Sequence, residues 1–310
     1  MALEVTLSSL LTATRLLADN HRLTDAQLTP VINQGCSRLH DKLTAAYGAD
    51  YKMSFANFYL PASVTSLPIV YSVTFSGGTG AFTMGNTLTG GSSGAKGVIR
   101  GVSAVSSVTG VLQLSDLSFT PNLAGTGFTG SETITDGGTG SATYVANNGG
   151  VGAADFYKLR GLDIFQSAGQ YLPLKPYVWK DRNAYTNAYA AFGTYPGTYL
   201  RYRILGKTLA FVPTPNASQL MRLSYTPTIT PLVNTTDVID GIDGWEQYIV
   251  NYAAMQCMLN EECDTSAIER QQAAYDATLT KMAEERDDGS PQVVAAASDS
   301  DDYGPYGSGL

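Results

Sequence analysis

Residues 245–288 constrain the fold of this chain more than any other stretch. Their apolar side chains recur every three or four positions, which predicts two consecutive amphipathic helices. The first stripe comprises Tyr248, Tyr252, Met255 and Leu259, and the second comprises Ile268, Tyr275, Leu279 and Met282. Asp264 or Thr265 is placed to cap the second helix, and Gly289 ends it. Two such helices cannot bury their own stripes, so the stripes need cover from elsewhere in the chain or from a neighbouring copy.

Two further helices are predicted before residue 50. The first spans residues 6–19, with Thr6 as its cap and an apolar face of Leu7, Leu10, Leu11 and Leu17. The second begins in a capping-box sequence at residues 24–27 and runs to about residue 47. Its apolar face comprises Leu28, Val31, Ile32, Leu39 and Leu43. Pro30 either kinks this helix or marks its start, with Thr29 as the cap.

From residue 51 the hydrophobic period changes from helical to alternating, which indicates β-strands. Residues 51–75 predict two or three strands, and the alternation resumes after residue 150. There, residues 199–205 and 208–213 form a predicted hairpin with Gly206 and Lys207 as its turn, and residues 219–226 form another strand. We therefore predict one antiparallel β domain built from residues 51–75 and 151–235.

The intervening residues 76–150 are rich in Gly, Ser, Thr and Val and contain almost no charge. Phe82 and the run Thr87-Leu88-Thr89 recur, with the same spacing, as Phe128 and Thr133-Ile134-Thr135. A repeat of short strands joined by Gly-rich turns favours a folded insert, a small barrel or sandwich of two related halves, over a disordered linker. The GxGxxG match at residues 125–130 precedes a strand rather than a helix, so it does not indicate a dinucleotide site.

Composition and motifs exclude several classes of function. Cys36, Cys257 and Cys263 suit no disulfide framework, and His21 and His40 lack further ligands at usable spacing. The sequence contains no catalytic triad, phosphate-binding loop or HExxH motif. We therefore expect no catalytic, cofactor-binding or metal-binding residues and no enzyme activity. With no signal peptide and no apolar run long enough to cross a bilayer, we expect a soluble protein without membrane insertion.

The charges are unevenly distributed along the chain. The net charge of −8 argues against a protein that wraps nucleic acid. Within residues 155–210, however, eight Lys and Arg oppose three Asp, and aromatic residues lie between them. Such a mixture fits a nucleic-acid surface or a protein interface, and we favour an interface because acidic regions of the chain could dock on it. The predicted partner surface comprises Arg160, Tyr177, Trp179, Arg182, Tyr189 and Tyr195.

The order of these segments resembles the head-to-tail adaptor, or connector, proteins of tailed bacteriophages. The resemblance rests on residues 155–163, 211–215, 244–254 and 286–294 and covers residues 1–75 and 151–294. It implies an α+β fold in which the helices of residues 1–50 and 236–290 form one bundle beside the antiparallel β domain. The insert of residues 76–150 resembles small β modules that decorate phage structural proteins, and residues 291–310 form a flexible or docking arm.

The resemblance implies a virion structural protein of the neck, assembled in the bacterial cytoplasm. Such adaptors form rings, usually of twelve copies, between the portal protein and the tail tube or nozzle, and double-stranded DNA passes through them without specific binding. The implied contact between copies uses Leu28, Ile32, Leu39, Trp245, Tyr248, Tyr252, Tyr275, Leu279 and Met282. The implied portal-docking residues are Pro291, Val293, Val294, Asp299, Tyr303 and Tyr306.

Two alternatives stay open at the level of sequence. The chain could be another tail or baseplate protein, which predicts a different ring symmetry. It could also be a host-binding module, in which residues 76–150 bind surface glycans and the helices form a stalk.

Overall fold

A computed structural model of the chain describes residues 5–18, 23–48, 51–104, 108–167, 169–183, 200–239, 244–260 and 263–285. The protein has a mixed α+β fold, as predicted. It divides into a helical unit, residues 1–51 with 231–310, and a β unit, residues 52–230. Among the described helices, none has the length and apolar character needed to span a membrane.

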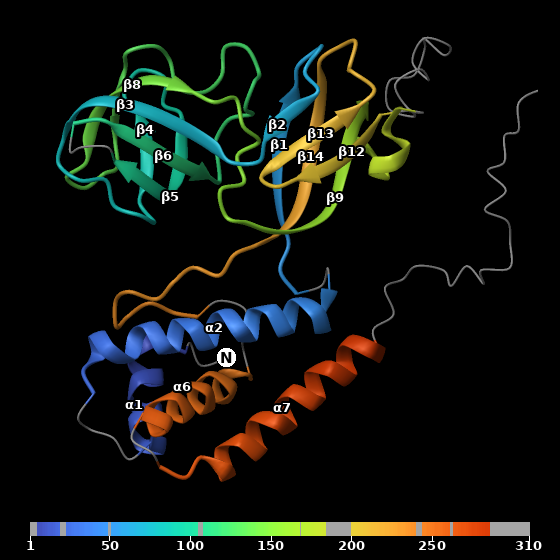
Figure 1. Cartoon of the computed structure of the whole chain (residues 1–310). Helices are drawn as coiled ribbons and strands as arrows, with labels where there is room; N and C mark the ends of the chain where they lie inside the picture. The colour runs from blue at the N-terminus through green and yellow to red at the C-terminus, as the bar shows by residue number, and fades with distance from the viewer. Residues whose placement is uncertain are drawn as a thin grey trace, which may run out of the picture. The chain divides into compact units, whose positions relative to one another are not determined.

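The described part of the helical unit contains four α-helices (Figure 1). They are α1 (Leu7–Ala18), α2 (Asp25–Ala46), α6 (Glu246–Asn260) and α7 (Ser266–Glu285). Helix α6 contacts the other three, and α2 also contacts α7. Because α6 is surrounded in this way, it buries consecutive residues, from Tyr248 to Ala254, rather than the single stripe that its period predicts.

Two residues assigned to apolar stripes are exposed instead. Leu17 of α1 is 37% exposed and Leu259 of α6 is 51% exposed. Each is the second-last residue of its helix, so no following turn continues the stripe. In α1, the buried face is completed by Thr14 rather than by Leu17.

The helix starts follow the predicted capping chemistry. The Thr24 backbone N–H donates to Gln27 Oε1 at 3.0 Å, which completes the capping box of α2. Pro30 lies inside α2 and does not mark its start, and the Thr29 hydroxyl donates to the Asp25 carbonyl rather than capping a helix. At α7, the Ser266 N–H donates to Asp264 Oδ1 at 2.9 Å.

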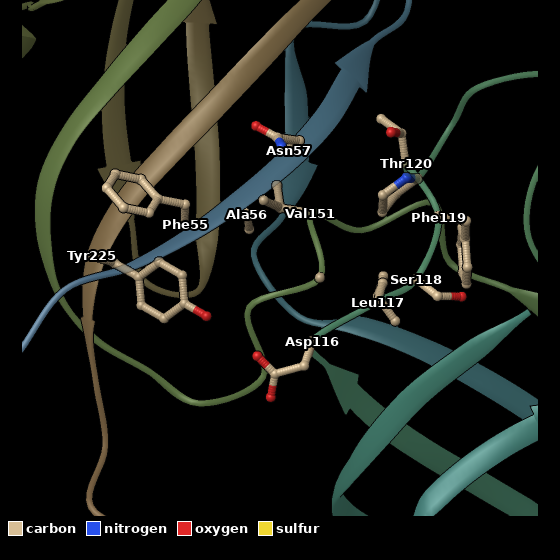
Figure 2. Close-up of a pocket in the computed structure, with 12 residues that line it drawn as sticks. Phe55, Ala56, Asn57, Asp116, Leu117, Ser118, Phe119, Thr120, Val151 and Tyr225 are labelled. Atoms are coloured by element: carbon tan, nitrogen blue, oxygen red, sulfur yellow. The ribbon is translucent and has the colours of Figure 1, made fainter.

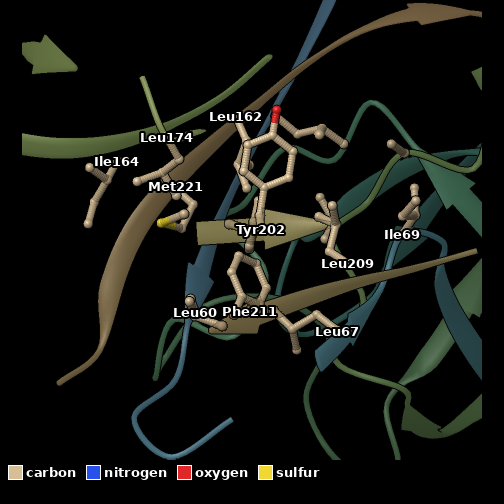
Figure 3. Packing of buried hydrophobic residues seen from close by; sticks show 14 of the residues in the cluster. Leu60, Leu67, Ile69, Leu162, Ile164, Leu174, Tyr202, Leu209, Phe211 and Met221 are labelled. Atoms are coloured by element: carbon tan, nitrogen blue, oxygen red, sulfur yellow. The ribbon is translucent and has the colours of Figure 1, made fainter. Parts of the chain in front are cut away.

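Two four-stranded sheets of the β unit share one hydrophobic core. The first has the order β1 (Ser54–Leu60), β14 (Gln219–Pro227), β9 (Phe156–Ser167) and β10 (Gln170–Pro173). The second has the order β11 (Lys175–Pro176), β12 (Arg201–Leu205), β13 (Thr208–Val212) and β2 (Ser66–Pro68). Neighbouring strands are antiparallel except for β11 with β12. Figure 3 shows Leu162 and Met221 of the first sheet packed with Tyr202, Leu209 and Phe211 of the second.

The predicted insert is a closed six-stranded barrel, not a sandwich. Its order is β3 (Tyr71–Thr79), β6 (Gly110–Ser115), β5 (Lys96–Ala104), β4 (Thr87–Gly90), β7 (Thr133–Thr135) and β8 (Ser141–Asn147). The barrel sheet therefore begins at Tyr71 rather than at the expected residue 76. Alternating hydrophobicity is the same on both sides of that boundary, so the period cannot show which sheet a strand joins.

The sequence repeat corresponds to a two-fold relation within the barrel. Exchanging β3, β4 and β5 with β6, β7 and β8 leaves the order of neighbouring strands unchanged. Leu88 and its repeat counterpart Ile134 are both fully buried, and the counterparts Thr89 and Thr135 pair directly with each other. The two related halves thus interleave their strands to close one barrel.

Candidate functional site

The predicted contact residues between copies are mostly covered within one chain. Six of the nine are buried: Leu28, Ile32, Leu39, Tyr248, Tyr252 and Leu279. Trp245, Tyr275 and Met282 are half-buried, and the Trp245 and Tyr275 ring centroids lie 6.0 Å apart. The apolar stripes are therefore largely covered within one chain, and of the nine predicted contact residues the three half-buried ones can present side chains to a neighbouring copy.

Polar contacts fix the helices around these aromatic residues. Asp276 accepts a hydrogen bond from the Tyr248 hydroxyl at 3.1 Å and pairs with Lys42 at 3.0 Å. Burial raises the pKa of Tyr248, and the nearby Asp276 carboxylate raises it further. The Asn33 side chain of α2 forms two hydrogen bonds with the main chain of Leu232. Its Nδ2 donates to the Leu232 carbonyl at 2.9 Å, and its Oδ1 accepts from the Leu232 N–H at 2.8 Å.

The helical unit also has exposed aliphatic side chains that its sequence pattern did not predict. Leu16 is 71% exposed and Val233 is 75% exposed, in addition to Leu259. Leu16 lies off the predicted stripe and Val233 lies in a connecting segment, so helical period gave no signal for either. Exposed aliphatic residues of this kind are candidate contact points for another protein.

Three residues of the predicted partner surface lie together in the segment that follows strand β11. Tyr177 is buried, and its ring stacks at 6.5 Å from that of Trp179, which is 46% exposed. The Arg182 guanidinium lies 4.6 Å from the Trp179 ring centroid. Arg160, in contrast, belongs to β9 of the first sheet, where its Nε donates to Thr226 at 2.7 Å. Tyr189 and Tyr195 lie outside the described residues.

A second aromatic surface, on the outer face of the first sheet, was not predicted. Arg222 lies at its centre, donating to Asp163 Oδ2 at 3.0 Å with its guanidinium 3.8 Å from the Tyr171 ring centroid. The Phe55 side chain on the neighbouring strand β1 is 53% exposed, and its ring centroid lies 5.3 Å from the Arg222 guanidinium carbon. The four residues come from four different strands, so only the strand register brings them together.

A cavity of about 260 Å³ lies between strand β1 and residues 116–121, which follow barrel strand β6. Figure 2 shows Phe55, Ala56 and Asn57 on one side of it and Asp116 to Thr120 on another, and Tyr225 also lines it. The lining contains one carboxylate, that of Asp116, and no His or Cys. Because this carboxylate already pairs with Arg100 at 2.9 Å, the cavity offers no unpaired acid for chemistry.

The same region joins the barrel to the sheets through a polar network. Buried Asp155 accepts a hydrogen bond from the Tyr225 hydroxyl at 2.9 Å, and Arg100 of the barrel lies 4.0 Å from its other oxygen. Burial raises the pKa of Asp155, and burial together with the adjacent Asp155 raises the pKa of Tyr225. The network is suited to holding the two β bodies together rather than to moving protons.

Two other buried carboxylates tie the halves of the barrel to each other. Glu132 accepts from the backbone N–H groups of Ser92, Ser93 and Thr129, and Asp136 accepts from those of Thr83, Gly138 and Gly140. Although burial alone raises the pKa of such a carboxyl, these donors bring the pKa of both below its usual value. Among the described residues, no three His, Cys, Asp or Glu side chains gather to form a metal site.

The predicted portal-docking residues, Pro291, Val293, Val294, Asp299, Tyr303 and Tyr306, all lie outside the described residues. His21 does as well. His40 is buried in α2, where its Nδ1 lies 3.4 Å from the Tyr51 hydroxyl.

Comparison with protein families gives one informative match. The family model described as SU10 adaptor protein matches residues 126–296, which is more than half of the chain. The match begins inside the barrel, before β7, and continues through strands β7 to β14 and both C-terminal helices. It therefore includes barrel strands β7 and β8, which belong to the segment of residues 76–150 that the resemblance did not cover. Among curated proteins, none matches the chain.

Proposed function

The chain belongs to the SU10 adaptor protein family, and from this premise we propose that it is the head-to-tail adaptor of a phage virion. In this role it joins the portal protein to the tail tube or nozzle and acts by binding alone, without catalysis or a cofactor. The observation that carries the proposal is the family match, which spans strands β7 to β14 and the C-terminal helices.

Copies of the chain assemble into a closed ring, with twelve as the expected number. A ring needs heterologous contacts, in which two different surfaces of one copy meet those of its neighbours. Half-buried Trp245, Tyr275 and Met282 and exposed Leu16 and Leu259 supply apolar contact area on the helical unit. Two surfaces of the β unit supply aromatic and Arg side chains of the kind that dominate binding energy at interfaces. One surrounds Arg222, and the other comprises Trp179 and Arg182.

Charge supports a passive passage for DNA through this ring. Residues 52–230 contain 12 Lys and Arg against 6 Asp and Glu, whereas the remainder of the chain contains 7 against 21. An acidic protein that lines the channel repels phosphate, so the duplex slides without being held. Residues 76–150 project outward from the ring, and residues 291–310 dock on the portal.

Cryo-electron microscopy of purified virions tests the proposal, because it gives both the location and the symmetry of the protein. We expect a ring at the neck, in contact with the portal. Finding the protein in a six-fold baseplate, or only as a monomer outside assembled particles, would refute the assignment.

A further inference from the structure

Strand β1 forms one edge of the first sheet and has none of the usual protections of an edge strand. An edge presents a row of unpaired N–H and C=O groups, which proteins commonly shield with charged residues, Pro or a bulge. Strand β1 contains no charged residue and no Pro, and its pairing with β14 runs without a register shift. The opposite edge strand, β10, contains Pro173 and a register shift between Gln170 and Tyr171. Strand β1 is therefore the edge that needs cover.

The chain covers only the last part of this edge. The Tyr59 N–H donates to the Pro121 carbonyl at 2.9 Å, and Asn122 Nδ2 donates to the Tyr59 carbonyl at 3.1 Å. Both main-chain groups of Tyr59 therefore point away from β14. Because these groups alternate in direction along a strand, those of Asn57 and Phe55 point the same way. In the described part of the chain, neither residue has a hydrogen-bond partner on this side.

The uncovered part of β1 borders the cavity of about 260 Å³. Phe55 and Asn57 line one side, and Leu117 and Phe119 line another (Figure 2). The main-chain groups of Leu117 and Phe119 likewise form no hydrogen bond with any residue that the structure describes. An extended peptide carries donors and acceptors along both of its edges, so it matches a cavity with unpaired main-chain groups on two sides.

Side-chain directions on β1 determine which residues an added strand can carry. Ala56 and Phe58 point into the core, whereas Phe55 and Asn57 point to the outer face. Residues that pair with Phe55 and Asn57 therefore have outward side chains, and the residue between them has an inward one. Fully buried Val151 lines the cavity on that inner side, so a small apolar side chain fits there.

We propose that an extended segment of a partner protein adds to β1 as a further strand and pairs antiparallel with Phe55, Ala56 and Asn57. Antiparallel pairing continues the pattern of the first sheet. The segment donates an N–H opposite Phe55 and another opposite Asn57, so it contains no Pro at those two positions, and it places a small apolar residue opposite Ala56. The proposal goes beyond the adaptor role and does not depend on ring formation.

The cavity accepts a single segment rather than the β1 edge of another copy. A second copy would bring its whole first sheet, because its own β1 is paired with β14. Residues 116–121 lie on the far side of the cavity, where the next strand of an incoming sheet would have to lie. Pairing between two β1 edges is therefore blocked, whereas a lone strand is not.

Hydrogen exchange measured by NMR on the full, isotopically labelled chain tests strand addition, with the peptide acetyl-Thr-Val-Ala-Val-Thr-amide as the probe. In the free chain, the amides of Phe55 and Asn57 should exchange at least about tenfold faster than those of Ala56 and Phe58, which point towards β14. Near-saturating peptide should slow exchange at Phe55 and Asn57 at least about tenfold. Peptide methylated at both Val nitrogens should have no effect, because those N–H groups donate to β1.

Two substitutions at one position separate strand addition from other modes of binding. Asn57→Pro removes the outward N–H, and Pro is tolerated on an edge strand where the N–H faces away from the sheet. This variant should lose peptide binding, whereas Asn57→Ala keeps the N–H and should bind as the parent chain does. Circular dichroism checks that both variants are folded, and the methylated peptide makes the same test on the parent chain.

Four outcomes would overturn the proposal. Slow exchange of Phe55 and Asn57 in the dilute free chain would show that the chain itself covers this edge. Protection that grows with chain concentration, without peptide, would make another copy the occupant. Unchanged exchange with peptide, or equal effects of the methylated and unmethylated peptides, would exclude main-chain pairing. A ring at the neck would stand in each case, so this proposal and the proposed function fail independently.

Discussion

Single residues show how burial and hydrogen bonding act in opposite directions on acidic side chains of the β unit. Asp136 and Glu132 are buried yet have a lowered pKa, because several N–H groups stabilise their ionised form. Asp155 is buried with fewer donors, and burial raises its pKa. The two kinds of carboxylate therefore give opposite dependences of stability on pH.

Asp136→Asn should destabilise the barrel by about 1.5–3 kcal/mol at neutral pH, because hydrogen bonds to an ionised acceptor are lost. Hydrogen exchange at the amides of Thr83, Gly138 and Gly140 measures this locally. Asn86→Ala, which removes only a 3.4 Å contact to the same carboxylate, should have a smaller effect. Protection that is unchanged in Asp136→Asn would contradict this role.

The pH dependence of the barrel follows from the lowered pKa of Glu132 and Asp136. In the unfolded chain such groups bind protons near pH 4, and in the folded barrel they do so only at lower pH. Their stabilising contribution is therefore complete above pH of about 4 and is lost as the pH falls through the folded value. Barrel amide protection measured from neutral pH downward should decline in that acidic range, and the decline should be smaller in Asp136→Asn.

Asp155→Asn should not reduce the stability of the β unit at neutral pH by more than about 1 kcal/mol, since the Tyr225 hydroxyl can still donate to the amide oxygen. A carboxyl whose pKa is raised in the folded protein stabilises the fold at pH values below its ordinary pKa near 4. This stabilisation is lost as the pH rises through the pKa of the folded state. Urea unfolding across this range should therefore show a decline in the parent chain that Asp155→Asn lacks. Tyr225→Phe is the control that should destabilise, because it leaves the carboxylate without its donor.

At the scale of elements, helices α2 and α6 of the helical unit approach each other closely at Gly35. A Cβ at Gly35 of α2 would lie 3.1 Å from Tyr252 Cδ1 and 3.3 Å from Ile249 Cγ2, both on α6. The absence of a side chain at this position lets the two helices pack tightly, and helical period alone does not reveal it.

Gly35→Leu should lower the stability of the helical unit by about 1–3 kcal/mol through overpacking against α6. Gly35→Ala should change it by less than about 1 kcal/mol, since a gain in helix propensity opposes the tight contact. Thermal unfolding followed by far-ultraviolet circular dichroism measures both. Ser37→Leu, on the exposed side of the same helix, is the matched control and should have little effect.

On the scale of the whole molecule, the chain enters the barrel and leaves it at adjacent positions of the β unit. The Ile69 carbonyl accepts hydrogen bonds from the N–H groups of Gly152 and Ala153, at 3.2 and 3.1 Å. The main chain of Val70 also touches that of Gly150, where an added Cβ would meet the Val70 carbonyl. An inserted domain with adjacent ends can be removed without stretching the remaining chain.

Removal of residues 71–149, with two Gly joining Val70 to Gly150, should leave the two sheets folded and ring assembly intact. The sheets should be less stable, because Tyr59 loses its bond to the Pro121 carbonyl and Asp155 loses Arg100. Circular dichroism and analytical ultracentrifugation measure fold and assembly. A folded chain that no longer forms rings would show that the barrel belongs to the assembly interface.

The sequence by itself determined the helices, their capping residues, the hairpin turn at Gly206 and Lys207 and the two-half character of the barrel. These features depend on local period, on turn chemistry or on a repeat, all of which are written along the chain. Of the candidate contact residues, Trp179, Arg182, Trp245, Tyr275 and Met282 were named in advance, because aromatic and Arg residues stand out by type alone and Met282 lies on a helical stripe. The surface around Arg222 and the exposed Leu16 and Val233 were not.

Only the tertiary structure decided that Tyr71 begins the barrel sheet and that Arg222 meets Asp163 and Tyr171. Each of these depends on strand register, which joins residues far apart in the sequence. The burial of Tyr248 and Leu279 within one chain was also decided there, because an apolar stripe shows that cover is needed but not which surface supplies it.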